Sequence, residues 1–427
     1  MTQALPSDSQ AYKARVVDPL VETYLRAFGG LLIEGPKWCG KTWTGQHHAN
    51  SAVYVEDQDT QDLADLDPVD VLTGPSPRLV DEWQDAPLLW DKARRMIDQA
   101  AQKGMFIFTG SAVPPREATK HSGVGRFARL RMRPMSLFES GESTGSVSLA
   151  GLMQGESVRP QPSRLTLKDV VWLISRGGWA GSLGLPRDEA IEVPQQYLVG
   201  VAESDLSRVD GVDRDPMKVA AVVRSLARHT ATAARVSTIH ADVVGQEDKK
   251  SAVSLSSVKN YLTALERIFV IDDLPAWRYS IRSKTQLRVS SKRHLADPSL
   301  AVAALGANPA VLHRDVKTTG FLFESLCVRD LRVYAQANRA TVLHYRDANG
   351  LEVAAVMTGP GDNWGAVEVK LGRAGVDAAA VNLLRLRNKL HGVAPEPAFL
   401  LVLTATGGVV HTRDDGVHVV PIDCLGP

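Results

Sequence analysis

The chain has 427 residues, enough for two to four domains, and its 44% hydrophobic and 23% charged residues are typical of a globular protein. Its formal net charge is only +1, so overall charge points to neither nucleic acid nor a membrane surface as a partner, although local basic patches are not excluded. The three cysteines, Cys39, Cys327 and Cys424, are far apart and do not have the spacing of metal ligands. The N-terminus has no apolar signal segment, and the apolar runs are shorter than a membrane span. We therefore expect a cytoplasmic protein without a membrane anchor.

The first part of the chain alternates between apolar and helical segments. Residues 1–18 are polar and predict a flexible arm, whereas the spacing of Leu20, Tyr24 and Phe28 predicts a helix over 19–28. Short apolar runs then predict buried strands, with a helix at 87–101, and these strands lie at 30–34, 52–55, 78–81, 105–109 and 129–134. This alternation indicates an α/β domain with a parallel sheet.

The second half of the chain changes character twice. Residues 145–225 are mostly helical with Gly and Pro interruptions, and residues 216–305 predict helices followed by a short hairpin. Residues 315–427 return to strands, which we place at 331–336, 341–347, 351–357, 364–371 and 398–403, with a helix at 376–390. The C-terminal part is therefore predicted to be a second α/β unit.

A phosphate-binding loop follows the first predicted strand. The pattern G-x-x-x-x-G-K-[ST] is matched at every fixed position by Gly35, Pro36, Lys37, Trp38, Cys39, Gly40, Lys41 and Thr42. Loop amides would cradle the β-phosphate, Lys41 would neutralise the β- and γ-phosphates, and the Thr42 hydroxyl would bind Mg²⁺. We include Trp43 among the nucleotide-binding residues and expect ATP and Mg²⁺ as cofactors. The alternative is a tight glycine turn that binds nothing.

An acidic pair ends the strand predicted at 78–81, as expected for a Walker B segment. We expect this strand to lie beside the strand that precedes the loop, so that Asp81 holds Mg²⁺ through water and Glu82 polarises the attacking water. The next strand ends at Thr109 and Ser111, which are candidate sensors of the γ-phosphate. The alternatives are an exposed loop for the acidic pair and an ordinary turn for Thr109 and Ser111.

Arginines follow these strands in a glycine-bearing loop. Arg126 is a candidate arginine finger, acting on a γ-phosphate, either within the chain or in a neighbouring subunit, and trans action would demand a homo-oligomer. Arg176 is a weaker candidate of the same kind. Arg129, Arg131 and Arg133 alternate with apolar residues and make one face of their segment basic. The alternative for Arg126 is a structural arginine paired with carboxylates.

The chain resembles a large group of prokaryotic AAA-type P-loop ATPases with a C-terminal domain of unknown function. The resemblance to the ATPase part is carried by LLIEGPKWCGKTWT, RLVDEWQDAP, FIFTGSAVPP and RMRPMSLFESGES. The resemblance to the C-terminal domain is carried by FLFESLCVRDLRVYA and WGAVEVKLG. The resemblance implies an α/β P-loop NTPase fold with further modules. Beyond the polar arm predicted at 1–18, these are an AAA-type ATP-binding domain at 19–145, a helical lid at 146–215, a winged-helix-like region at 216–305 and a restriction-endonuclease-like α/β domain at 306–427.

The last domain carries a degenerate nuclease-like pattern. Nucleases of the type that the resemblance suggests use a helix Glu, a strand Asp and an E-x-K on the following strand to hold Mg²⁺ and hydroxide. Glu324, Glu368 and Lys370 fit this pattern, but Ala354 stands where the Asp is expected. Glu352 shares the face of Ala354 and is a candidate substitute. The alternatives are a retained fold with a Glu–Lys pair, or a module that binds nucleic acid or protein without cutting.

The winged-helix-like region combines two predicted helices with a basic hairpin. The helices lie at 236–244 and 254–270, the second capped by Ser254. Basic residues mix with Trp277 and Tyr279, a composition that suits contact with phosphates; they are Lys259, Arg267, Arg278, Arg282, Lys284, Arg288, Lys292 and Arg293. Nearby Glu266, Asp272 and Asp273 dilute this patch, and ordinary solvated surface is the alternative.

The sequence therefore predicts an ATPase that binds ATP or ADP and uses Mg²⁺-dependent hydrolysis to move or gate its C-terminal module, in association with DNA or a protein partner. A slow nucleotide-sensing switch that binds DNA or protein is the alternative. An ATP-regulated nuclease fits less well because of Ala354.

Overall fold

The structure is a computed structural model that describes residues 12–114, 119, 121–245, 253–279, 290–406 and 408–427. The chain divides into two compact units. Unit 1 comprises residues 1–134, 203–214 and 263–270, and unit 2 comprises residues 135–202, 215–262 and 271–427. The two short segments of unit 1, 203–214 and 263–270, are thus excursions of the chain from unit 2.

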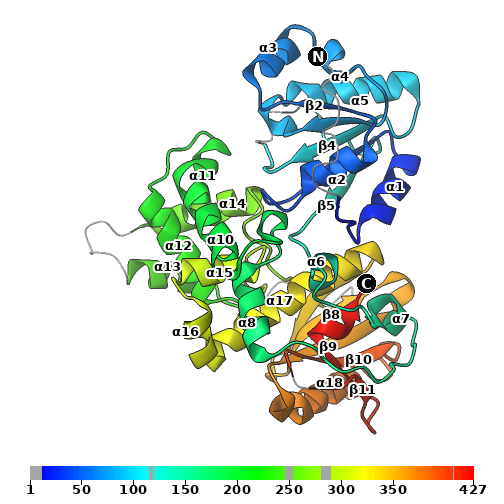
Figure 1. The fold of residues 1–427 in the computed structure, drawn as a ribbon, viewed down its shortest axis with the longest axis vertical. Helices are drawn as coiled ribbons and strands as arrows, with labels where there is room; N and C mark the ends of the chain where they lie inside the picture. The colour runs from blue at the N-terminus through cyan, green and yellow to red at the C-terminus, as the bar shows by residue number, and fades with distance from the viewer. Residues whose placement is uncertain (1–11, 115–118, 120, 246–252, 280–289, 407) are drawn as a thin grey trace. The chain divides into compact units, whose positions relative to one another are not determined.

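Unit 1 is built on a five-stranded parallel sheet in the order β2-β3-β4-β1-β5 (Figure 1). The strands are β1 (Gly30–Glu34), β2 (Ser51–Tyr54), β3 (Arg78–Asp81), β4 (Phe106–Gly110) and β5 (Phe127–Arg131). The helices are α1 (Asp18–Ala27), α2 (Lys41–His48), α3 (Gln58–Leu66), α4 (Pro68–Leu72), α5 (Leu88–Ala100) and α11 (Leu206–Arg208). The predicted parallel α/β sheet is confirmed, with boundaries within two or three residues of those expected.

Both faces of this sheet are buried, which explains why its strands are continuous apolar runs. Successive residues point to opposite faces, so Leu32 packs in one cluster with residues of α3, α4 and α5, including Trp90. Leu31 and Ile33 pack in the other cluster with residues of α1, including Leu20. The result is a three-layer arrangement in which the carboxyl ends of the strands share one edge.

Unit 2 begins with a helical region. Its helices are α6 (Leu137–Ser140), α7 (Leu149–Met153), α8 (Leu167–Arg176), α9 (Arg187–Ala190), α10 (Glu192–Gly200), α12 (Pro216–Arg228), α13 (Val236–Val244), α15 (Pro298–Ala304) and α16 (Pro309–Arg314). α14 (Leu255–Arg267) runs from unit 2 into the second excursion. The helices predicted at 236–244 and 254–270 are confirmed, the second over Leu255–Arg267.

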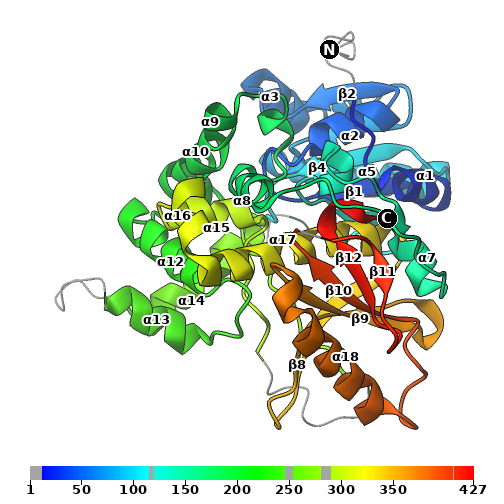
Figure 2. The same cartoon turned by 60° about the horizontal axis from the view of Figure 1, so that its bottom comes forward.

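A six-stranded mixed sheet forms the rest of unit 2, in the order β11-β12-β10-β9-β8-β7 (Figure 2). Its strands are β7 (Thr341–Arg346), β8 (Glu352–Thr358), β9 (Trp364–Lys370), β10 (Phe399–Thr404), β11 (His411–Thr412) and β12 (His418–Pro421). α18 (Val376–Leu390) packs on one face through a cluster that includes Leu383, Val356 and Val402. A short parallel pair of β6 (Val147–Ser148) and β13 (Leu425–Gly426) joins distant parts of the chain.

The strand predicted at 331–336 is wrong, because these residues are the last turns of α17 (Val316–Ala337). α17 contacts α8, α15 and α16 in the helical region as well as β7, β8 and β9 of the sheet. Leu331, Val333, Tyr334 and Ala335 are therefore all buried, although they point in different directions around the helix. A helix buried on every side lacks the 3.6-residue alternation, so a short apolar stretch of it cannot be distinguished from a buried strand.

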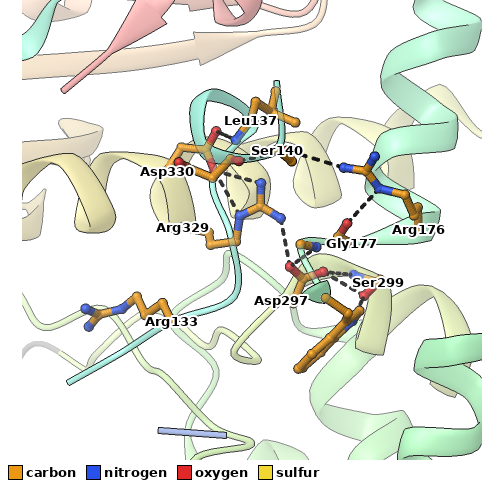
Figure 3. A network of polar contacts seen from close by, with 12 residues as sticks. Arg133, Leu137, Ser140, Arg176, Gly177, Asp297, Ser299, Arg329 and Asp330 are labelled. Carbon is orange, nitrogen blue, oxygen red and sulfur yellow. Dashed lines mark hydrogen bonds and ion pairs between the residues drawn. The ribbon is translucent and has the colours of Figure 1, made fainter. Parts of the chain in front are cut away.

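A buried polar network ties the parts of unit 2 to α17 (Figure 3). The Arg329 guanidinium lies 2.8 Å from Asp297 Oδ2 and 2.7 Å from Asp330 Oδ1. Asp297 also accepts a hydrogen bond from the Gly178 N–H at 3.0 Å, and Asp330 accepts one from the Leu137 N–H at 3.0 Å. Because each of these buried charges has partners, the network specifies one arrangement of α15, α17 and the segments around residues 137 and 178.

Candidate functional site

The predicted phosphate-binding loop lies between β1 and α2, at the carboxyl edge of the unit 1 sheet. Gly40 is the N-cap of α2 with a φ of +100°, a conformation that favours glycine, and Trp38 has a φ of +62°. A Cβ atom on Gly35 would lie 2.2 Å from the Met132 carbonyl oxygen, so this position also requires glycine. The loop is therefore a built turn with a strained residue, as is common where backbone approaches a ligand.

The donors of the loop are arranged for an anion. Within the described part of the chain, no acceptor lies in hydrogen-bond range of the main-chain N–H groups of Gly40 and Lys41. The Lys41 side chain is buried, and its ammonium donates to the Pro36 carbonyl oxygen at 3.0 Å, back across the loop. Unsatisfied amides at a helix N-terminus beside an ammonium group favour phosphate.

Asp81 reaches the loop from β3, although the predicted adjacency of β3 to β1 is wrong. β4 lies between them, and α2 contacts both β4 and β3, which brings Thr42 to Asp81. The Thr42 hydroxyl is 3.0 and 3.1 Å from the two Asp81 oxygens, and the Thr109 hydroxyl also donates to Asp81. Burial raises the pKa of Asp81 to about 6, an effect that the Thr109 hydrogen bond partly opposes.

Glu82 is positioned by the end of β4. It has a φ of +53°, and its carboxylate accepts hydrogen bonds from the Ser111 hydroxyl at 2.6 Å and from the Ser111 N–H at 3.3 Å. The Gln84 amide donates to the same oxygen. The structure thus brings Asp81, Glu82, Thr109 and Ser111 together at the ends of β3 and β4.

Arg126 lies at the amino-terminal ends of the strands, opposite the carboxyl ends where the phosphate-binding loop lies. β1 and β5 are parallel, and the Gly30 N–H donates to the Arg126 carbonyl at the start of β1, whereas the loop follows the end of β1. Five residues of strand separate the two places by roughly 15 Å. Arg126 instead pairs with Asp98 of α5 at 2.7 Å. Action on a phosphate held by its own chain is therefore incompatible with this position.

Two other predicted nucleotide-binding residues, Trp38 of the loop and Trp43 of α2, face outward. Trp38 and Trp43 are 55% and 44% exposed, which is unusual for tryptophan. The Lys37 ammonium lies 2.6 Å from Asp205, in the first excursion of unit 1. The loop therefore presents aromatic surface and a contact to a distant segment of sequence, besides its amides.

Arg176, the weaker finger candidate, is structural in unit 2. Its buried guanidinium pairs with Glu142 and donates to the Gly177 carbonyl oxygen at 3.0 Å, and it lies near Ser140 (Figure 3).

The nuclease-like residues of unit 2 do come together, but around a cation that the sequence did not assign to them. The buried Lys292 ammonium lies 2.6 Å from Glu324 of α17 and 2.9 Å from Glu352 of β8. Lys370 lies 3.3 Å from Glu368 on β9. Among the described residues, no group of three or more His, Cys, Asp or Glu side chains is placed to hold a metal ion.

The electrostatics of this cluster follow from burial and from its two lysines. Although burial opposes it, the carboxylates of Glu324 and Glu352 raise the pKa of Lys292. Burial raises the pKa of Glu368, and Lys370 partly offsets that effect. Ala354 is buried in β8 and adds no ligand. Lys292 had been placed in the basic hairpin, so only the tertiary structure shows that it neutralises this cluster.

The basic patch predicted for the winged-helix-like region is reduced in the structure. Lys292 is buried and Arg293 pairs with Asp273, while Arg267 donates to the Val113 carbonyl oxygen. Lys259 is exposed. Arg278 is half-buried, and the other predicted members, Arg282, Lys284 and Arg288, lie outside the described residues.

One residue close to the loop was missed by sequence reasoning. Arg15, in the predicted flexible arm, is buried and donates to the Cys39 carbonyl oxygen at 2.7 Å. Residues 12–17 therefore do not behave as a free arm, whereas residues 1–11 lie outside the described residues. A polar sequence before a helix carries no signal that could have revealed this contact.

Comparisons with known proteins divide the chain into three segments. Residues 28–140 match an AAA domain, residues 167–311 match a domain of unknown function (DUF8612), and residues 319–425 match a second domain of unknown function (DUF4143). No curated protein matches the chain. A solved structure, the Walker-type ATPase of Pyrococcus abyssi, is 13% identical with a TM-score of 0.40, over 67% of this chain and 94% of that chain. A similarity this low supports no argument.

The AAA match, the parallel sheet and the loop geometry agree. Residues 28–140, which match the AAA domain, include the parallel sheet and the loop of unit 1, and this part of the chain has a P-loop NTPase fold. Of the two segments of unknown function, 319–425 lies in unit 2, and 167–311 lies in unit 2 apart from the two excursions of unit 1. In the described part of the chain, no helix combines the length and apolarity needed to cross a bilayer.

Proposed function

We propose that the protein is a Mg²⁺-dependent ATPase whose hydrolysis moves or gates its C-terminal module, residues 306–427. The observation that carries the proposal is the loop at residues 35–42, where free main-chain N–H groups, the Lys41 ammonium and the N-terminus of α2 meet within an AAA domain. These groups bind the triphosphate, with Lys41 exchanging the Pro36 carbonyl for phosphate oxygens.

The residues next to the loop suit Mg²⁺. Thr42 and Asp81 offer a hydroxyl and a carboxylate within one hydrogen bond of each other, and these oxygen donors are the kind that Mg²⁺ prefers. Two protein oxygens are enough when phosphates and water complete the shell. The ion would neutralise charge on the phosphates.

Glu82 is the group proposed to orient and polarise the attacking water. Its carboxylate is held by Ser111 and Gln84, and Thr109 donates to Asp81, so Thr109 and Ser111 connect the end of β4 to both acids. This arrangement supports their assignment as sensors of the γ-phosphate. Trp38 and Trp43 remain proposed as nucleotide contacts because of their exposure beside the loop.

Coupling to the rest of the chain is supported by the two excursions of unit 1. Asp205 in the first excursion pairs with Lys37 of the loop at 2.6 Å. Arg267 in the second donates to the Val113 carbonyl oxygen at 2.9 Å, two residues after Ser111. Both excursions continue along the chain into unit 2, so a shift of the loop or of the β4 end would be felt by segments that lead there.

Steady-state phosphate release tests the proposal, with Glu82→Gln as the variant and Glu22→Gln, on the exposed side of α1, as the matched control. An ATPase shows Mg²⁺-dependent release that falls about 100-fold or more in Glu82→Gln, while Glu22→Gln behaves like wild type. Equal rates in the two variants would contradict the assignment of Glu82. Absence of ATP and ADP binding by calorimetry would remove the whole proposal.

The second candidate is a slow nucleotide-sensing switch that binds DNA or a protein. The observation that favours it is the carboxylate of Glu82, which is engaged by Ser111 and Gln84 instead of lying free for water. Tight ATP retention without turnover in the same assay would support the switch. Stimulation by added DNA would identify DNA as its output, and the winged-helix-like region, 216–305, is the proposed DNA contact.

For the C-terminal module we propose a restriction-endonuclease-like fold without cleavage. Its helix α17 and its mixed sheet bring Glu324, Glu352, Glu368 and Lys370 near one another, but Lys292 neutralises the cluster and Ala354 supplies no ligand. Mg²⁺-dependent cutting of plasmid or single-stranded DNA that Lys370→Ala abolishes would overturn this assignment and favour an ATP-regulated nuclease.

A trans role for Arg126 in a cytoplasmic homo-oligomer remains a proposal, supported by its exposed position away from its own loop. Mixing Arg126→Ala with Glu82→Gln tests it. Recovery of hydrolysis in the mixture, from two inactive variants, indicates shared sites, and inactivity at every ratio contradicts them.

A further inference from the structure

Arg15 contacts the back of the phosphate-binding loop, although it lies before the segment that matches the AAA domain. Its side chain is only 6% exposed. One guanidinium nitrogen, Nη1, donates to the Cys39 carbonyl oxygen at 2.7 Å, and the other, Nη2, donates to the Arg133 carbonyl oxygen at 2.9 Å. A single planar group therefore connects the loop to the chain that follows β5.

The contact with Cys39 fixes which way the next amide points. The Cys39–Gly40 peptide is trans, and in a trans peptide the carbonyl and the following N–H point in opposite directions. Because the Cys39 carbonyl points at Arg15, the Gly40 N–H must point away from Arg15. The Gly40 N–H, like that of Lys41, has no acceptor within the described part of the chain.

Gly40 is also the residue that lets Arg15 come so close. A Cβ atom at this position would lie 3.1 Å from Arg15 Nη1, and the φ of +100° already favours glycine. The invariant glycine of the phosphate-loop pattern thus has a second purpose in this chain, since it leaves room for the guanidinium behind the loop.

Arg15 is itself held firmly. Its main-chain N–H donates to Asp18 at 2.7 Å, and the same carboxylate accepts from the Tyr12 hydroxyl at 2.7 Å and lies 3.1 Å from His48 at the end of α2. Tyr12 also stacks on His47 of α2 with ring centroids 4.1 Å apart. Residues 12–18 therefore contact the phosphate-binding loop through Arg15 and the C-terminal end of α2 through Tyr12 and Asp18.

We propose that Arg15 is a positioning residue of the nucleotide site, which orients the Cys39–Gly40 peptide so that its N–H faces the phosphates and which places a permanent positive charge behind them. The inference rests on the proposed function. Arg15 is expected to affect binding of the phosphates and not of the base or sugar, because it contacts the carbonyl of the peptide whose N–H is the Gly40 donor. Lysine cannot replace arginine fully, since one ammonium does not reproduce a fork that reaches two carbonyls.

Calorimetry and kinetics on the full chain test this role, with MgATP, MgADP and magnesium tripolyphosphate as ligands. The variants are Arg15→Met, Arg15→Lys and the control Arg26→Met, whose side chain is 69% exposed on α1. Arg15→Met should raise Kd for ATP and for tripolyphosphate by a similar factor, about 10- to 100-fold. The KM for ATP should rise with little change in kcat, because the amide binds ground state and transition state alike. Arg15→Lys should be intermediate, and Arg26→Met should match wild type.

A purely structural role predicts a different result. Arg15→Met would then melt at a lower temperature but, when folded and well below that temperature, would bind tripolyphosphate as tightly as wild type, and this outcome overturns the proposal. If Arg15→Met does not fold, Arg15→Lys carries the test, and unchanged KM and Kd in that variant overturn it equally. Wild-type protein that binds neither ATP nor tripolyphosphate removes the proposed function as well, whereas normal wild-type binding with no effect at Arg15 removes only this inference.

Discussion

Replacing Lys292 by methionine removes the cation at the centre of the carboxylate cluster in unit 2. Its side chain is 3% exposed, and it bridges Glu324, which is 17% exposed, and Glu352, which is 39% exposed. Methionine keeps most of the aliphatic stem, so the loss is chiefly of charge and hydrogen bonds. The variant leaves two carboxylates without their shared partner.

The magnitude follows from the burial of each pair. Removing one partner of a buried ion pair costs about 3–5 kcal/mol. The half-exposed Glu352 recovers solvation and contributes little, so we expect Lys292→Met to cost about 3 kcal/mol, mostly through Glu324. Lys370→Met is the matched control, because Lys370 is 34% exposed and lies 3.3 Å from Glu368. Its cost should be about 1 kcal/mol or less.

Chemical denaturation of the transition that includes unit 2 measures these values, and a double-mutant cycle isolates the pair. Glu324→Gln alone should cost about 1–2 kcal/mol, because Lys292 retains Glu352. In the Lys292→Met background the same change should restore about 1–2 kcal/mol, since it removes the unpaired charge. Equal costs for Lys292→Met and Lys370→Met, or strictly additive effects in the cycle, would refute the idea that Lys292 neutralises the cluster.

Three further predictions concern other parts of the molecule. Trp43→Ala should weaken ATP binding about 5- to 100-fold, because the variant loses an aromatic face for the base, and it should leave tripolyphosphate binding unchanged. Equal losses of affinity for both ligands in calorimetry would contradict a base contact. Asp205→Asn should free Lys37 for the phosphates and lower the KM for ATP by up to about fivefold, with stability changed by less than about 1 kcal/mol; a higher KM would count against the coupling. Burial lowers the pKa of His344 to about 4 in the folded protein, whereas the histidine has a pKa near 6.5 in the unfolded chain. As the pH falls, the unfolded chain therefore binds a proton at His344 before the folded protein does. The free energy of unfolding should fall by up to about 3 kcal/mol as the pH drops from 6.5 to 4. The loss should shrink in His344→Gln when denaturation curves are compared across this range, and an unchanged pH profile would contradict it.

The sequence by itself determined the features that depend on local pattern. The phosphate-loop motif, the apolar runs of unit 1 and the acids at the end of β3 are each encoded within about ten neighbouring residues, and the structure places Thr42, Asp81, Thr109 and Ser111 near one another. Buried parallel strands read as continuous apolar runs, so their existence is visible without a fold. Their order is not, which is why β4 was not expected between β1 and β3.

Only the tertiary structure decided the contacts between residues far apart in sequence. Arg15 meets Cys39, and Lys292 meets Glu324 and Glu352, through packing that no local spacing encodes. The strand expected at 331–336 became helix because α17 is buried on all sides and loses its periodic signature. Local pattern reports what one element can bury, whereas the partner of a buried charge depends on which elements the whole chain brings beside it.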